Sequence, residues 1–174
     1  MIDLTMSKAF TREESEGQAL PEIAPLPSAL PPGARNLMTP DGADRLRAEL
    51  LRLMETERPR LAADKTDPEA KRRLALLDQK ILQLQQSLES AEVISPPRGT
   101  AKSVTFGATV KVRSDDGDEI FRIVGVDETD HERGRISYLS PVARALMNAR
   151  VGQRVEFNYP CGSETVEVLD IRYE

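Results

Sequence analysis

The stretch LALLDQKILQLQQSLESA, residues 74–91, decides the fold of this chain. Its apolar residues recur at steps of three and four, at Leu74, Leu77, Ile81, Leu84, Leu88 and Ala91. This is the a/d heptad spacing, which places these side chains on one narrow stripe of a single helix. A matching stripe lies upstream, at Ala43, Leu46, Leu50 and Leu53. The stretch therefore predicts a helix that packs lengthwise against a second helix.

A polar segment with a helix-breaking proline, DKTDPE at residues 64–69, separates the two stripes. Two stripes joined by such a break predict an antiparallel helical hairpin with an acidic tip. Thr39 and Asp67 each precede a proline, and both pairs predict a helix start with an N-cap side chain and proline at the first helical position. Pro59 is expected to kink the first helix or to mark a bend in it.

From Ser103 onwards the apolar period changes to two, which is typical of strands with one buried face. Apolar and polar residues alternate in residues 104–112, 121–126, 136–138, 155–159 and 166–173. The run DDGD at residues 115–118 is a turn signal between the first two strands. Ser140 and Pro141 predict a short helix that reaches Asn148, with the serine as N-cap. The C-terminal part is therefore predicted to be a compact α+β module.

These patterns divide the chain into four parts. Residues 1–36 are rich in proline without periodicity, which predicts a disordered tail. Residues 37–94 form the predicted hairpin, whose second helix ends near Val93, and residues 95–102 form a linker. Residues 103–174 form the C-terminal domain. The predicted fold class is α+β: an antiparallel coiled-coil hairpin followed by a small antiparallel β-sheet domain with one short helix.

Composition excludes several classes of protein. The net charge is −5 and no part of the chain is strongly basic, so free nucleic acid is not the expected partner. No run reaches the roughly 18 apolar residues of a membrane span. Cys161 is the single cysteine, which suits a reducing, cytoplasmic compartment. Neither Cys161 nor His131 has a His or Cys neighbour in sequence, so no stable metal site and no thiol nucleophile is predicted.

A series of different short motifs follows one another along the chain in a characteristic order. The N-terminal half has MTPDG at 38–42, Leu46, EL at 49–50 and ERP at 57–59. The C-terminal half has FGA at 106–108, DDGD at 115–118, FRIVG at 121–125, DE at 127–128, IS at 136–137, SP at 140–141, ARAL at 143–146, VG at 151–152 and Tyr173. This set, spread over residues 37–174, resembles the GreA/GreB family of bacterial transcription elongation factors, with a shortened coiled coil.

The resemblance implies a globular domain similar to the FKBP fold and a partner, RNA polymerase. In that family the globular domain docks on the rim of the secondary channel, and the coiled coil reaches inward towards the RNA 3′ end. Acidic tip residues then help hold a second Mg²⁺ at the polymerase active centre, because hard cations need oxygen ligands. The polymerase cleaves its own RNA, so the resemblance implies a monomeric regulator with no cofactor of its own, not an enzyme.

The tip departs from the family pattern. The usual string GDLSENAEY is absent, and the arm is shorter by a turn or two of each helix, or about 10 Å of reach. The candidate tip residues for Mg²⁺ assistance are Asp64, Asp67 and Glu69. They act as ligands only at first-shell distances of about 2.0–2.6 Å. Helix capping by Asp67, solvation of Asp64 and a dipole contact by Glu69 explain the same residues without a metal.

On the globular domain, the resemblance assigns polymerase docking to Leu139, Ser140, Pro141 and Arg144. Leu139 departs from the family, whose members usually carry Asp or Asn there. Capping of the short helix explains Ser140 and Pro141 without any partner. The basic run at residues 71–73 suits either a solvated helix face or contact with acidic polymerase walls or RNA phosphates.

The leading hypothesis is therefore a Gre-like regulator that inserts a shortened arm into the polymerase, either assisting transcript cleavage or blocking channel access. One alternative is a peptidyl-prolyl isomerase of FKBP type, which needs a deep aromatic pocket. The chain has four Phe, three Tyr and no Trp, several of which the small core requires. The other alternative is a structural adaptor that dimerises through the coiled coil.

Overall fold

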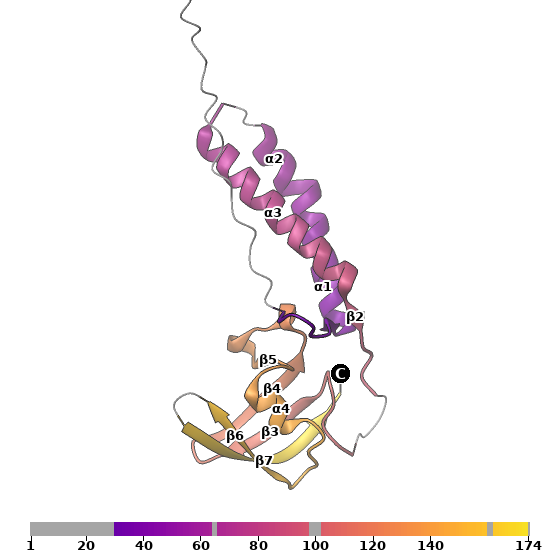
Figure 1. The fold of residues 1–174 in the computed structure, drawn as a ribbon, viewed down its shortest axis with the longest axis vertical. Helices are drawn as coiled ribbons and strands as arrows, with labels where there is room; N and C mark the ends of the chain where they lie inside the picture. Colours follow the sequence, from indigo (N-terminus) through magenta and orange to yellow (C-terminus); the bar gives the residue numbers. More distant parts are fainter. Residues whose placement is uncertain (1–29, 64–65, 98–101, 160–161, 174) are drawn as a thin grey trace, which may run out of the picture.

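The computed structural model describes residues 30–63, 66–97, 102–159 and 162–173, so predictions about residues 1–29, Asp64 and Cys161 lie outside the described residues. Figure 1 shows a long helical arm that stands on one end of a β-rich globular domain. The arm consists of α1 (Pro40–Arg52), η1 (Leu53–Glu57), α2 (Arg58–Ala63) and α3 (Pro68–Ser90). The first three run outward and α3 runs back beside them, which is the predicted helical hairpin.

Both long helices begin as predicted. The Thr39 side chain accepts a hydrogen bond from the Gly42 amide at 3.0 Å, and the Asp67 side chain accepts one from the Glu69 amide at 2.9 Å. In each helix a proline follows the cap, where its missing N–H leaves no intrahelical bond unmade. Each side chain thus satisfies one of the amides that a helix start leaves without a partner.

The helix changes its hydrogen bonding directly before Pro59, where the sequence predicts a kink or bend. The preceding segment, η1, is a π-helix, and the Arg58 amide bonds to the Leu53 carbonyl five residues back. Proline has no N–H, and its ring collides with the carbonyl four residues earlier in a regular helix. The wider π-turn directly before Pro59 relieves both problems, and α2 continues to Ala63.

The hairpin buries only a narrow seam. Its buried apolar residues are Ala43, Leu53, Ala70 and Ile81, and the other seam leucines are half-buried. Two ion pairs bridge the helices beside the seam, from Lys80 to Glu49 at 2.6 Å and from Arg58 to Asp78 at 2.7 Å. Such exposed pairs add little stability, so the apolar stripe holds the hairpin together.

The base of the arm differs from the prediction both before the first helix and after the last. The second helix ends at Ser90 rather than near Val93, and Glu92–Val93 forms a short strand, β2. β2 pairs in parallel with β1 (Leu37–Met38), which precedes the first helix. Backbone hydrogen bonds hold this pairing: the Glu92 amide bonds to the Asn36 carbonyl at 2.7 Å, and the Ile94 amide bonds to the Met38 carbonyl at 2.9 Å.

The predicted disordered tail is therefore wrong at its C-terminal end. Asn36 is buried, and its side-chain amide donates to the Ser87 carbonyl at 2.9 Å and to the Ser90 hydroxyl at 3.0 Å. Carbonyls in the last turn of a helix lack intrahelical partners, so a nearby amide donor is strongly held. Sequence periodicity gives no sign of this contact, because it joins residues 51 and 54 positions apart.

The globular domain is a curled sheet in the order β5-β4-β3-β7-β6. Its strands are β3 (Thr109–Ser114), β4 (Gly117–Val124), β5 (Arg135–Ser137), β6 (Arg154–Tyr159) and β7 (Gly162–Arg172). The predicted turn joins β3 to β4, with Ser114 opposite Gly117. The sheet is mixed rather than purely antiparallel, because β5 returns through the 3-10 turns η2 (Val126–Glu128) and η3 (His131–Arg133) to pair in parallel with β4.

The short helix α4 (Pro141–Leu146) lies against the sheet, and Ser140 caps it as predicted by accepting from the Ala143 amide at 3.2 Å. Residues 104–108 are not a strand, although Val104, Phe106 and Ala108 alternate as one would. They form buried turns whose side chains join the core. The alternation of apolar and polar residues predicted the buried positions correctly, but the predicted strand is wrong. A buried turn can show the same alternation as a strand.

Candidate functional site

The predicted tip residues are engaged in holding the start of α3. Asp67 caps the helix, and Glu69 forms an ion pair with Arg73 one turn later at 3.3 Å. Glu69 also lies in the first helical turn, where a negative charge complements the helix dipole. Asp64 lies outside the described residues. Across the described ranges, no three His, Cys, Asp or Glu side chains cluster in a way that could hold a metal ion.

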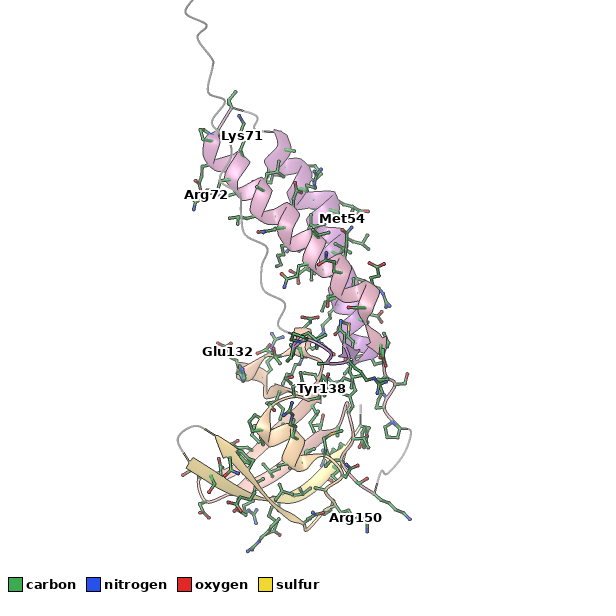
Figure 2. The ribbon with its side chains drawn as sticks, in the orientation of Figure 1. Met54, Lys71, Arg72, Glu132, Tyr138 and Arg150 are labelled. Atoms are coloured by element: carbon green, nitrogen blue, oxygen red, sulfur yellow. The ribbon has the colours of Figure 1, made fainter. Side chains whose placement is uncertain are left out.

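A basic run follows the tip. Figure 2 shows Lys71 and Arg72 at the free end of the arm. Both are exposed, and the structure gives neither an ion pair within the described part of the chain. Their charges are therefore available to an anionic partner.

The predicted docking segment follows β5 directly. The Leu139 amide donates to the Ser137 hydroxyl at 3.1 Å, and Ser140 caps α4. Pro141 and Arg144 are exposed on that helix, while Leu139 is half-buried. The structure thus brings the four residues together on one short corner of the globular domain. Tyr138, one residue earlier, donates its hydroxyl to the Arg35 carbonyl at the base of the arm (Figure 2).

A buried carboxylate joins the arm to the globular domain. Glu128, at the end of η2, is 4% exposed. One of its oxygens accepts the Thr39 amide at 2.8 Å and the Gly125 amide at 3.1 Å. The other accepts the Thr39 hydroxyl and lies 3.6 Å from the Arg45 guanidinium. We call Thr39, Gly42, Arg45, Gly125 and Glu128 the joint.

Two glycines leave room for the close approach of the arm and the globular domain at the joint. A Cβ on Gly42 would overlap the Glu128 carboxyl group, and a Cβ on Gly125 would overlap the Leu37 carbonyl. Glycine is therefore required at both positions by space rather than by backbone angle.

Exposed contacts surround the joint. Arg122 donates to Asp41 at 3.1 Å, and Arg35 pairs with Glu92 beside β1 and β2. The hydrogen bond from Arg35 lowers the pKa of the Glu92 carboxyl below its ordinary value. A cavity of about 220 Å³ opens next to the joint, lined by residues that include Arg45, Arg135 and Glu128.

Comparison with known proteins gives matches to one family model and to several relatives. The family model described as "Transcription elongation factor, GreA/GreB, C-term" matches residues 99–173. A transcription elongation factor GreB from Neisseria meningitidis serogroup B is 38% identical over 154 residues, which cover 80% of this chain and 94% of the relative. A GreA from Beijerinckia indica is 35% identical over 152 residues, with coverages of 79% and 97%.

This chain belongs to the GreA/GreB family of transcription elongation factors. A solved GreA/GreB structure from Nitrosomonas europaea is 23% identical, covers 79% of this chain and 98% of its own, and superposes with a TM-score of 0.38. That superposition is too weak to add to the assignment, which the sequence matches carry. They confirm the predicted class, a transcription factor rather than an enzyme, and they give no support to the isomerase alternative.

For this GreA/GreB-family chain, sequence reasoning found the caps and the exposed ends and missed the joint. Thr39, Gly42 and Glu128 all stand in the motifs MTPDG and DE that carried the family resemblance. What the sequence did not reveal is that these two motifs, 89 residues apart at Thr39 and Glu128, bind each other. Within the described residues, no helix has the length and apolar content needed to cross a membrane.

Proposed function

We propose that this factor binds RNA polymerase in the cytoplasm as a monomer, docks its globular domain on the rim of the secondary channel, and inserts the arm. The docking corner is formed by Leu139, Ser140, Pro141 and Arg144. The inserted arm modulates transcript cleavage or access to the channel. The factor needs no cofactor of its own, and any Mg²⁺ it assists is shared with the polymerase active centre.

The projecting arm is the observation that carries this proposal. α3 has 23 residues, so it spans about 34 Å at 1.5 Å per residue. The arm stands clear of the globular domain along most of that length (Figure 1). A slender rod whose free end carries exposed basic side chains next to the acidic residues Asp67 and Glu69 fits a narrow channel that leads to nucleic acid.

The short reach of the arm favours occupancy of the channel over delivery of a metal ion. Asp67 directs its carboxylate to the Glu69 amide, and Glu69 pairs with Arg73. A carboxylate has two oxygens and can cap a helix and ligate an ion at once, so capping does not decide between these roles. Reach does, because a carboxylate ligates only within about 2.0–2.6 Å of the ion and this arm is shorter than the family pattern by about 10 Å. We therefore expect the arm to limit access to the channel more strongly than it stimulates cleavage.

Two assays test the proposal. In a pull-down with core polymerase, the full chain is expected to be retained, and Arg144→Glu is expected to weaken retention by about tenfold. Arg150→Glu is the matched control, since Arg150 is exposed at the opposite end of the globular domain from the arm (Figure 2). A chain that ignores polymerase would overturn the proposal.

The second assay follows cleavage of RNA in stalled elongation complexes. Channel occupancy predicts that the factor leaves cleavage unstimulated and slows the entry of small substrates. Cleavage that the wild type restores, and that the double variant Asp64→Ala/Asp67→Ala loses, would replace occupancy with metal assistance. Asp67→Asn separates the causes of such a loss, because asparagine keeps the N-cap but removes the charge.

A further inference from the structure

We infer that Glu128 is a positioning residue: its buried carboxylate fixes the direction in which the arm leaves the globular domain. The effect of Glu128 on entry of the arm into the polymerase rests on the proposed function. The direction of the arm in the free protein does not rest on that function and can be tested separately.

The carboxylate binds both parts of the molecule at once. The oxygen that accepts the Gly125 amide of the globular domain at 3.1 Å also accepts the Thr39 amide of the arm at 2.8 Å. Hydrogen bonds weaken steeply as their angles bend, so a shared acceptor with donors on both sides restricts rotation between them. Apolar contacts have no comparable directionality.

The second oxygen extends this control into the first turn of α1. The Thr39 hydroxyl donates to Glu128 and accepts the Gly42 amide at 3.0 Å. Because the Thr39 hydroxyl donates its hydrogen bond to Glu128, a lone pair of the hydroxyl oxygen is left to face the Gly42 amide. The N-cap of the arm is therefore oriented by a residue of the globular domain.

Buried polar groups are concentrated at this place. Among the described residues, the buried polar or charged ones are Asn36, Thr39 and Glu128, and all three lie at the base of the arm. The remaining polar ties there involve exposed partners, such as Asp41 and Glu92. Exposed ion pairs contribute little and tolerate movement, whereas a satisfied buried network specifies one arrangement.

Small rotations at the joint have large effects at the tip. A rotation of about 10° moves the end of a rod of about 34 Å by about 6 Å. That displacement exceeds the width of a first coordination shell, which is about 2.0–2.6 Å in radius. Entry of the arm into a narrow channel thus depends on the joint even though no residue of the joint lies near the tip.

Distance measurements between spin labels test the inference in the full chain. Leu82→Cys on the arm is paired with either Ile120→Cys or Val151→Cys on the globular domain, in a Cys161→Ser background; all three labelled positions are exposed. The wild-type distances are expected to be narrowly distributed. Glu128→Ala is expected to widen both distributions about twofold or more, and Glu128→Gln to widen them less, because glutamine keeps one acceptor oxygen.

A second variant distinguishes loss of the Glu128 contacts from unfolding of the arm. Gly42→Ala favours the α1 helix by its propensity but displaces the carboxylate, so it should widen the distances while the helix content stays unchanged. Glu132→Ala is the matched control, since Glu132 is an exposed glutamate four residues further on (Figure 2). Unchanged distance distributions in both Glu128→Ala and Gly42→Ala would overturn the inference, whatever the polymerase assays show.

The polymerase assays then separate docking from positioning. Gly42→Ala and Glu128→Ala are expected to bind core polymerase within about threefold of the wild type, because none of the four docking-corner residues is a partner of the Glu128 carboxylate. Their effect on cleavage or channel access is expected to fall about tenfold or more. If wild type fails to bind, the proposed function fails, and the spin-label result still decides the role of Glu128.

Discussion

The arm and the globular domain bury their apolar residues in different ways. The fully buried large side chains of the globular domain come from several strands, from residues 104–108 and from α4, and they include Val104, Val110, Val112, Ile123, Val124, Leu146 and Val168. In the arm, Ile81 of the central seam remains 7% exposed, and most seam leucines are only half-buried. We therefore expect the domain to hold its own fold, whereas the arm depends on its seam and its base.

The difference follows from geometry. A sheet covered by a helix makes two layers that enclose side chains from both sides. Two helices alone enclose one stripe and leave the rest of each surface to solvent. A helix surface that projects into solvent cannot also be buried. The arm, which projects, therefore has the smaller buried core. The buried joint at Glu128 compensates by anchoring the arm where it meets the domain.

The largest expected effect comes from a charge in the seam. Ile81→Asp places a carboxylate among apolar side chains without a partner, which should cost about 3 kcal/mol or more of arm stability. The arm is expected to lose its helix while the globular domain stays folded. Circular dichroism at 222 nm measures the loss of helix in the arm. The NMR amide signals of residues 102–159 show whether the globular domain stays folded.

Leu82→Asp is the control for this variant, because Leu82 is the next residue along α3 and is 53% exposed. It should leave both signals unchanged. If Ile81→Asp unfolded the globular domain together with the arm, the two regions would form one cooperative unit and the contrast between them would fail. Light scattering on the same samples tests the adaptor alternative: a wild-type dimer that Ile81→Asp converts to a monomer would favour it.

Much of this fold could be predicted because its signals are local. The seam periodicity, the caps at Thr39 and Asp67 and the turn at residues 115–118 each depend on neighbours in sequence. The errors occurred where distant residues decide: β1 and β2 pair across 55 positions, from Leu37 to Glu92, and β5 joins β4 in parallel after an irregular connection. A two-residue strand is too short to show a period of its own.

The candidate site divides in the same way. Exposure of Lys71 and capping by Ser140 could be predicted, since helix position and residue type set both. Burial of Glu128 could not, because a lone glutamate in a polar run is expected to be solvated. Contacts with Thr39, Gly125 and Arg45, together with the space left by Gly42, make that carboxylate stable in the interior. Such a site is a property of the tertiary fold rather than of any segment.

An intermediate effect is expected from matched cap deletions in the two regions. Asp67→Ala and Ser140→Ala each remove an N-cap bond, which typically contributes about 1 kcal/mol. In the arm the loss should appear as local fraying, with faster hydrogen exchange near Ala70. In the domain it should lower the global free energy of unfolding, because α4 is packed into the core. Fraying confined to α4 in Ser140→Ala would contradict this distinction.

The smallest expected effect concerns acid and the hairpin of β3 and β4. Hydrogen bonds from Arg113, and secondarily from Lys111, lower the pKa of Asp118 from its ordinary 3.8 to about 2. A lowered pKa in the folded state stabilises the fold at pH values above 3.8, and this contribution disappears as the pH falls from 3.8 towards 2. Asp118→Asn should therefore be slightly less stable than the wild type at pH 6 and equal to it near pH 2, as measured by denaturant unfolding. The effect is small because solvent screens an exposed pair. Asp116→Asn, in the adjoining turn, should show no such convergence; if it did, general charge rather than the Arg113 contact would be responsible.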